Sequence, residues 1–225
     1  MINVANVLTV GRVVLALGTV SLLFVPGEQF RWAAFALTII VIWADGLDGY
    51  FARKLKQTSK LGGVLDIAGD RAVELVYWIV FAVLGWVPIW IPILFVVRGT
   101  FVDAMRSHAA EDGFTAFGAK TMMQSKVGKF LVASNFSRFS YAIAKAVAFC
   151  LLIAANTTTG KDTVVPAIAN FCVYFSAAFC LVRGLPVFFE GDNIFVFKPK
   201  VDVATVESPN PDVAIVKDQS PSSKA

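Results

Sequence analysis

The chain has 225 residues, of which 57% are hydrophobic and 16% are charged, whereas an ordinary soluble domain carries about 25% charged residues. Its mean hydropathy is +0.69 and its formal net charge is +4. The apolar residues form several long blocks along the chain, and one small soluble domain cannot bury that many helices that are apolar nearly all round. The composition therefore predicts an all-α, polytopic membrane protein. No Arg-rich aromatic pattern of the kind that binds RNA or DNA is present, so we expect no nucleic-acid partner.

Six apolar blocks follow one another along the chain, each of about 17 to 25 residues and therefore long enough to cross a hydrocarbon core of ~30 Å. The linkers between them contain the Gly, Pro, Asn and Thr residues that are typical of helix ends. We predict six transmembrane helices in a lipid bilayer, at residues 7–25, 30–52, 63–84, 88–105, 139–155 and 164–182.

The blocks form one predicted transmembrane domain, residues 1–185. Residues 186–225 are predicted to be a disordered cytoplasmic tail, because the end of the chain is rich in Pro, Ser and charge and has little to bury. Lys and Arg are concentrated in the linkers after the second and fourth blocks. The positive-inside rule places both basic linkers, and both chain ends, in the cytoplasm.

Four aspartates lie close to the linker between the second and third blocks. Asp45 and Asp48 are separated by three positions, and Asp66 and Asp70 by four. Each pair therefore lies on one face of its helix. Because the two helices are predicted to be antiparallel neighbours joined by a short linker, the two acidic pairs are expected to face each other.

These four carboxylates predict a site for divalent cations. A charge deep in a span costs about 2.5 to 3.5 kcal/mol, and like charges at short range raise one another's pKa; bound cations remove both problems. Oxygen ligands without His or Cys suit Mg²⁺, Mn²⁺ or Ca²⁺. Two alternatives remain open. The carboxylates could form structural ion pairs with Arg53 and Arg71, or they could belong to a divalent-cation transporter, since charges inside a membrane also mark ion pathways.

The aspartates belong to the pattern D-x-x-D-G-x-x-A-R, eight residues, then G-x-x-x-D-x-x-x-D, which runs from Asp45 to Asp70. This pattern resembles the full signature of the CDP-alcohol phosphotransferase family. The resemblance implies a six-helix fold and attack of an alcohol hydroxyl on the β-phosphorus of CDP-diacylglycerol, with release of CMP. It also implies two Mg²⁺ or Mn²⁺ ions, a homodimer, and a bacterial inner membrane with the active site on the cytoplasmic side.

The resemblance carries roles over to individual positions. Asp70 is implied to be both a metal ligand and the catalytic base that takes the proton of the alcohol. The other implied metal ligands are Asp45, Asp48 and Asp66. Contacts with the cytidine diphosphate are implied for Gly49, Arg53 and Ser59.

Two further segments resemble bacterial phosphatidylglycerophosphate synthases, a subgroup of this family. The stretch "NVANVLTVGRVVLAL" places Asn6, Thr9 and Arg12 roughly along one helix face, and "RGTFVDAMRSHAAEDG" contains Arg98 and Arg106. Arginine forks match phosphate oxygens. The predicted acceptor is therefore a phosphorylated polyol, with glycerol 3-phosphate preferred, and the predicted substrate-binding residues are Asn6, Thr9, Arg98, Arg106 and Lys129.

Three positions depart from that subgroup. Gly99 stands where an acidic residue is usual, Leu131 replaces a second lysine, and Arg71 after the last aspartate is more frequent in inositol-type relatives. Phosphatidylinositol phosphate synthase, or another headgroup synthase of the family, is therefore the main alternative. Arg98 and Arg106 could equally be snorkelling residues at a helix end.

Overall fold

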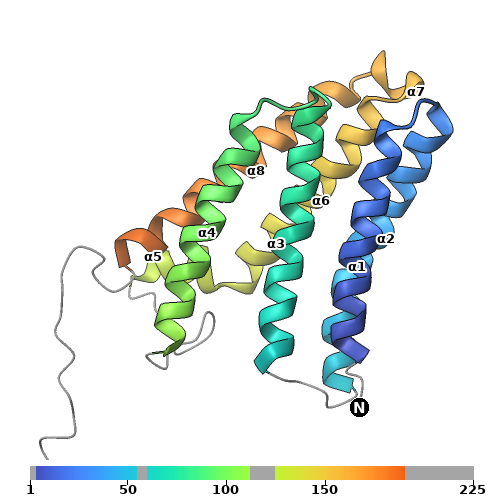
Figure 1. Cartoon of the computed structure of the whole chain (residues 1–225). Helices are drawn as coiled ribbons and strands as arrows, with labels where there is room; N and C mark the ends of the chain where they lie inside the picture. Colours follow the sequence, from blue (N-terminus) through green and yellow to red (C-terminus); the bar gives the residue numbers. More distant parts are fainter. Residues whose placement is uncertain (1–3, 55–59, 112–124, 191–225) are drawn as a thin grey trace, which may run out of the picture. The chain divides into compact units, whose positions relative to one another are not determined.

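The computed structural model describes residues 4–54, 60–111 and 125–190, and these ranges contain helices and no strands (Figure 1). Each of the six predicted apolar blocks overlaps one long helix, so the all-α class is confirmed for the described part of the chain. The long helices are α1 (Val4–Ser21), α2 (Glu28–Lys54), α3 (Lys60–Val83), α4 (Trp90–Glu111), α6 (Asn135–Ala155) and α8 (Val165–Glu190). Shorter elements are η1 (Leu22–Phe24), α5 (Lys126–Gly128), the π-helical turn η2 (Lys129–Ala133) and α7 (Thr158–Lys161).

Three of these segments are long and apolar enough to cross a bilayer, namely Asn6–Phe24, Asn135–Ala155 and Val165–Phe189. They support an integral membrane protein. The other long helices, α2, α3 and α4, carry the charged residues described in the next subsection. Six spans therefore remain a prediction, as do the boundary of the domain at residue 185 and the cytoplasmic tail, most of which lies outside the described residues.

Successive long helices run in opposite directions (Figure 1). Helix α1 packs against α2 and α3, α2 against α6, α3 against α4, and α8 against both α4 and α6. The turns between helices follow local chemistry: Gly27 and Gly85 adopt positive φ angles of 128° and 74°, which a residue with a Cβ atom rarely adopts.

Aromatic rings form the centre of the bundle. Trp78 in α3 stacks on Phe95 in α4, and Tyr77 in α3 stacks on Phe149 in α6, with ring centroids 4.9 Å apart in both pairs. Close van der Waals packing of this kind holds helices together where the surrounding lipid is as apolar as the helices. The rings therefore fix α3 against α4 and α6, one layer away from the charged residues of α3.

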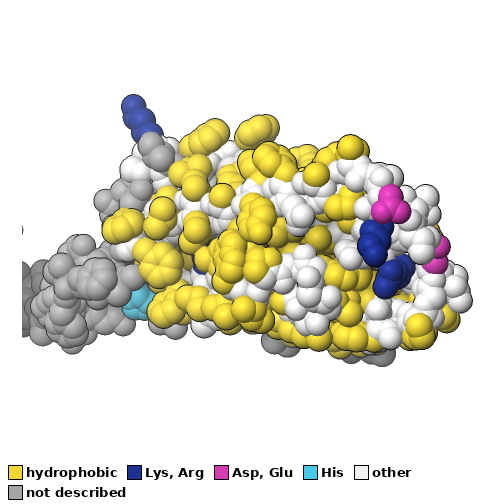
Figure 2. All heavy atoms as spheres, turned by 90° about the horizontal axis from the view of Figure 1, so that it is seen from above, with side chains coloured by type: hydrophobic (Ala, Val, Ile, Leu, Met, Phe, Trp, Pro, Cys, Tyr) yellow, Lys and Arg dark blue, Asp and Glu magenta, His cyan; other side chains and the backbone are white. Residues whose placement is uncertain are grey.

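Hydrophobic side chains cover most of the molecular face shown in Figure 2. Several large apolar side chains are more than half exposed, including Val14, Trp43, Phe139 and Phe171. A soluble monomer rarely exposes so large a continuous apolar area. This surface is the one expected of helices that face lipid.

Candidate active site

Helix α2 ends and α3 begins in the half of the bundle away from α7 (Figure 1). Side chains of α1, α2 and α3 meet one another before that end. The Arg12 guanidinium in α1 forms ion pairs with Asp45 in α2 and with Asp70 in α3. The Arg12 side chain is only 3% exposed, whereas the side chains of Asp45 and Asp70 are 49% and 51% exposed. A buried cation thus holds together two accessible carboxylates.

Gly69 allows α1 to come close enough for this contact. A Cβ atom at position 69 would lie 2.8 Å from Cγ2 of Thr9 and 3.5 Å from Nη2 of Arg12, whereas carbon atoms in contact are normally about 3.5–4.0 Å apart. Thr9 is buried against this position. The absence of a side chain directly before Asp70 therefore brings Arg12 to the carboxylates.

A pocket of about 180 Å³ opens beside the acidic pair. Its polar side chains are Arg12, Asp45, Asp70, Glu74 and Lys145, and its apolar wall comes from α2, α3 and α6. A pocket with a polar cluster on an apolar wall suits a ligand that has both a charged and an apolar part. The apolar wall consists of Val41, Ile42, Val73, Tyr77, Ala142, Ala146 and Phe149.

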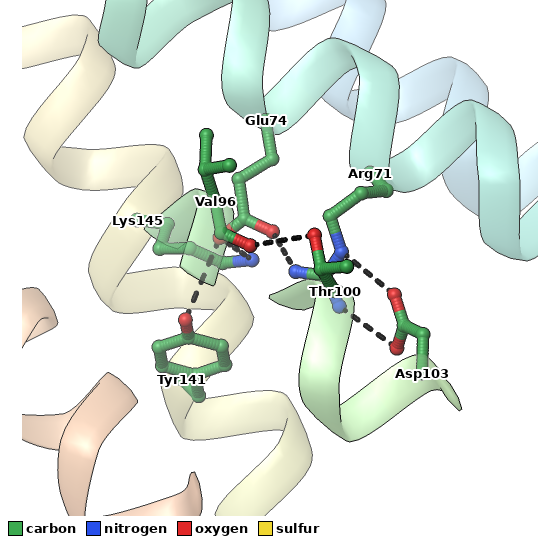
Figure 3. Close-up of polar contacts among 7 residues, drawn as sticks. All are labelled: Arg71, Glu74, Val96, Thr100, Asp103, Tyr141 and Lys145. Carbon is green, nitrogen blue, oxygen red and sulfur yellow. Dashed lines mark hydrogen bonds and ion pairs between the residues drawn. The ribbon is translucent and has the colours of Figure 1, made fainter. Parts of the chain in front are cut away.

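Glu74 lies one helical turn after Asp70 and is the centre of a buried polar network (Figure 3). Its carboxylate accepts hydrogen bonds from Lys145 Nζ at 2.8 Å, from Arg71 Nη1 at 2.9 Å and from the Tyr141 hydroxyl at 3.5 Å. Arg71 also donates from Nε and Nη2 to the two oxygens of Asp103, at 3.0 and 3.2 Å. The network joins α3 to α4 and α6.

A cluster of arginines lies on α4 and α8. Arg98 and Arg183 are buried, and each is close enough to Arg106 for their charges to repel. Arg98 packs against Gly184, where a Cβ atom would lie 3.1 Å from Cγ of Arg98. Arg98 is therefore a packed interior residue, and the snorkelling alternative does not describe it.

Arg183 also ties α8 to the segment that precedes α6. Its Nη1 donates to the Ser137 hydroxyl at 2.7 Å and its Nη2 to the Val132 carbonyl at 3.4 Å. Buried cations of like sign disfavour one another unless an anion is present. Asp103 also lies near Arg106, and its carboxylate binds Arg71. Three guanidinium groups and one carboxylate therefore gather on α4 and α8.

A family model described as CDP-alcohol phosphatidyltransferase matches residues 2–182. The chain belongs to this family. The family is generally dependent on divalent cations. The resemblance seen in the aspartate pattern is therefore confirmed, and the family match together with the names of the relatives below indicates a CDP-diacylglycerol-dependent phosphatidyltransferase.

Several relatives carry the name CDP-diacylglycerol–glycerol-3-phosphate 3-phosphatidyltransferase. The protein of Pseudomonas fluorescens is 30% identical over 169 residues, which cover 69% of this chain and 84% of the relative. The protein of Haemophilus influenzae is 33% identical over 114 residues, or 49% of this chain and 61% of the relative. That of Cereibacter sphaeroides is 32% identical over 108 residues, or 46% of this chain and 49% of the relative.

Two of the four predicted metal ligands come together among the side chains that the structure describes. Asp45 and Asp70 converge on Arg12, and Asp66 is half-buried on α3, one turn before Asp70. The side chain of Asp48 lies outside the described residues. Among the side chains that are described, no three His, Cys, Asp or Glu residues form a cluster that could hold a metal ion.

Of the remaining predicted substrate residues, the structure describes the side chains of Asn6 and Lys129. Asn6 is half-buried on α1, and Lys129 is exposed in η2. Gly49 and Arg53 belong to α2, but their surroundings are not described, and Ser59 lies outside the described residues. Their roles stay predictions.

Sequence reasoning missed Glu74, Lys145 and Arg183. Glu74 follows Asp70 by one helical turn, and Lys145 lies in the middle of the predicted fifth span. Charges inside a span are rare and usually functional or paired, and this signal could have identified both residues. The structural alternative that assigned Arg71 to the metal aspartates is wrong, because Arg71 binds Glu74 and Asp103 instead.

Proposed function

We propose that this chain transfers the phosphatidyl group of CDP-diacylglycerol to glycerol 3-phosphate and releases CMP. The observation that carries the proposal is the convergence of Asp45 and Asp70, from two helices, on a single cationic group. The names of the relatives supply the donor and the acceptor. Water could hydrolyse CDP-diacylglycerol in place of the transfer. The enzyme must therefore hold the acceptor beside the reacting phosphorus.

The acidic pair fits a divalent cation, because Asp45 and Asp70 are half exposed beside one pocket and offer hard oxygen donors. We propose that two Mg²⁺ or Mn²⁺ ions are held by Asp45, Asp48, Asp66 and Asp70. Bound there, the cations would stabilise negative charge on the oxygens of the diphosphate. Gly49, Arg53 and Ser59 are proposed to contact the nucleotide of the same substrate.

The arginine cluster is proposed to hold the phosphate of the acceptor. Arg98 and Arg106 were expected there from the sequence, and the structure adds Arg183 beside them. A phosphate dianion would relieve the repulsion among three guanidinium groups while accepting charge-assisted hydrogen bonds. Asn6, Thr9 and Lys129 are proposed as further contacts of the substrates.

Asp70 is proposed as the base that accepts the proton of the glycerol 3-phosphate hydroxyl. It must lie within hydrogen-bond reach of that hydroxyl. Arg71, its neighbour, binds Asp103 on the helix that carries Arg98 and Arg106. The base and the phosphate site therefore belong to helices that are joined directly.

We further propose six spans in a bacterial inner membrane, with the site facing the cytoplasm, and assembly as a homodimer. Helix α2 ends, α3 begins and α4 ends at one end of the bundle (Figure 1). The sequence concentrates Lys and Arg next to these helix ends, which favours the cytoplasmic orientation of that end. The lipid-soluble donor, CDP-diacylglycerol, and the water-soluble acceptor, glycerol 3-phosphate, would meet at that end.

An acceptor panel tests the function. Purified protein with Mg²⁺ or Mn²⁺ and CDP-diacylglycerol is offered glycerol 3-phosphate, inositol 1-phosphate, inositol or serine, and CMP is measured. The proposal expects the fastest release with glycerol 3-phosphate. Preference for inositol 1-phosphate would instead support the phosphatidylinositol phosphate synthase alternative, which Arg71 and Gly99 favour, and uptake of the metal without CMP release would support a transporter.

A further inference from the structure

Arg71 connects α3, the helix of Asp70, with α4, the helix of Arg98 and Arg106 (Figure 3). It follows Asp70 directly in α3, and its fork binds both oxygens of Asp103 in α4 at 3.0 and 3.2 Å. The third contact of the same guanidinium, to Glu74, is 2.9 Å long. One side chain thus uses three of its nitrogen atoms to hold two carboxylates of different helices.

Gly99 has no side chain, which leaves room for the Arg71 side chain to pack against α4. A Cβ atom at position 99 would lie 3.0 Å from Nε and 3.1 Å from Cζ of Arg71. Arg71 therefore contacts α4 at Gly99 and again one helical turn later at Asp103. Gly99 directly follows Arg98, and Arg71 directly follows Asp70. The contact between Arg71 and Gly99 therefore links the sequence neighbours of Asp70, the proposed base, and Arg98, a proposed phosphate-binding residue.

We propose that Arg71 is a positioning residue that sets the separation between the Asp70 carboxylate and the Arg98 guanidinium. This inference rests on the proposed function, in which one acceptor molecule contacts both groups. A bidentate pair between arginine and a carboxylate fixes direction as well as distance. The second contact, through Glu74 to Lys145 in α6, keeps the guanidinium from rotating about its bond to Asp103.

The separation matters most in the chemical step. An acceptor held by its phosphate can present its hydroxyl to Asp70 only if the two helices keep their register, and a displacement of about 1 Å can cost on the order of 100-fold in rate. The phosphate itself would still bind to the arginines. Loss of the Arg71 contact should therefore lower kcat for the phosphorylated acceptor and leave its KM nearly unchanged.

Two single variants test this prediction, Arg71→Lys and Asp103→Asn, with Thr100→Val as the matched control on α4. Thr100 donates only to the carbonyl of Val96 in its own helix. We expect both test variants to lose roughly tenfold or more in kcat with glycerol 3-phosphate. In Arg71→Lys, which leaves the charges around Arg106 unchanged, the KM values of both substrates should stay within about twofold of wild type. The control should match wild type in all three constants.

A double variant, Arg71→Met with Asp103→Leu, covers the case in which a single variant fails to fold. Removing one partner of a buried pair leaves an uncompensated charge, whereas replacing both by apolar residues is often tolerated. The double variant should keep the unfolding temperature of wild type and still show the loss in kcat. Wild-type turnover in this variant would overturn the inference.

Other outcomes also contradict it. A rise in the KM for glycerol 3-phosphate at unchanged kcat would make Arg71 part of the phosphate site. If kcat/KM fell equally for both substrates and the unfolding temperature also fell, Arg71 would have only a structural role. The acceptor panel on wild type tests the proposed function separately, since it does not depend on position 71.

Discussion

Gly69→Ala tests whether the close approach of α1 and α3 builds the acidic site. The new Cβ atom would lie 2.8 Å from Cγ2 of Thr9, so α1 must retreat by about 0.7 Å or more to restore an ordinary carbon contact. Overpacking of this kind typically costs ~1–3 kcal/mol of folding free energy. Because Arg12 lies one turn beyond Thr9 on the same face of α1, it retreats from Asp70 as well.

The expected effect on catalysis follows from the contacts of Arg12. A hydrogen bond to a charged group contributes about 1.5–3 kcal/mol, and a factor of ten corresponds to ~1.4 kcal/mol. If one of the two contacts of Arg12 is lost, the rate of CMP release from CDP-diacylglycerol should fall by roughly ten- to a hundredfold. Thermal unfolding in detergent, measured on the same preparation, separates this loss from loss of folded protein.

Two further variants make the test specific. Gly63→Ala lies on the same helix and has no atom within 4 Å of the added Cβ, so it should behave as wild type. Thr9→Ser combined with Gly69→Ala removes the clashing methyl group and keeps the hydroxyl, so it should recover most of the activity. The packing argument would be refuted if Gly63→Ala and Gly69→Ala had equal activity. It would also be refuted if the double variant were no more active than Gly69→Ala.

Three other predictions concern single groups. Asp45→Asn should abolish CMP release while the protein stays folded, because a charged metal ligand is lost and carboxylate repulsion falls; Asp162→Asn, exposed at the other end of the bundle, is the control, and near-normal turnover in Asp45→Asn would contradict the metal assignment. Arg106→Ala should lose roughly ten- to a hundredfold in kcat/KM for glycerol 3-phosphate, with the affinity for CDP-diacylglycerol unchanged; equal weakening of both substrates would argue for a structural role. Glu28 lies outside the predicted spans, and a hydrogen bond from Thr158 lowers its pKa, so it stabilises the fold at neutral pH and this contribution disappears as the pH falls through that lowered pKa. Glu28→Gln should therefore lower the unfolding temperature slightly at pH 7 and have no effect in acid; a difference that persists in acid would exclude the carboxylate as its cause.

The helices could be predicted from the sequence because each apolar block needs only local information. Continuous apolar runs and the breakers between them define six segments, and all six are helical in the described residues. The sequence also predicts that Asp45 and Asp70 come together, but through direct packing of their two helices. In the structure both carboxylates instead meet Arg12 of α1, which packs against α2 and α3.

The partners of these carboxylates could not be predicted in the same way. The sequence places Arg12 on the same face as Thr9 but contains no local signal that this face packs on α3, which depends on Gly69. Likewise, Arg71 had several carboxylates within reach, and its choice of Asp103 and Glu74 depends on the space above Gly99. Contacts between helices depend on shapes that no single helix encodes.

The burial of Arg12 has a consequence for the biogenesis of the protein. Helix α1 is synthesised before α2 and α3, so its arginine enters the bilayer before the chain has supplied Asp45 or Asp70. The cost is at most about 2.5–3.5 kcal/mol, the value for an arginine at the centre of a span. The cost is recovered only when α2 and α3 arrive and provide both carboxylates. Until then α1 carries an unmatched charge, so its insertion is less favourable than that of an apolar helix of the same length.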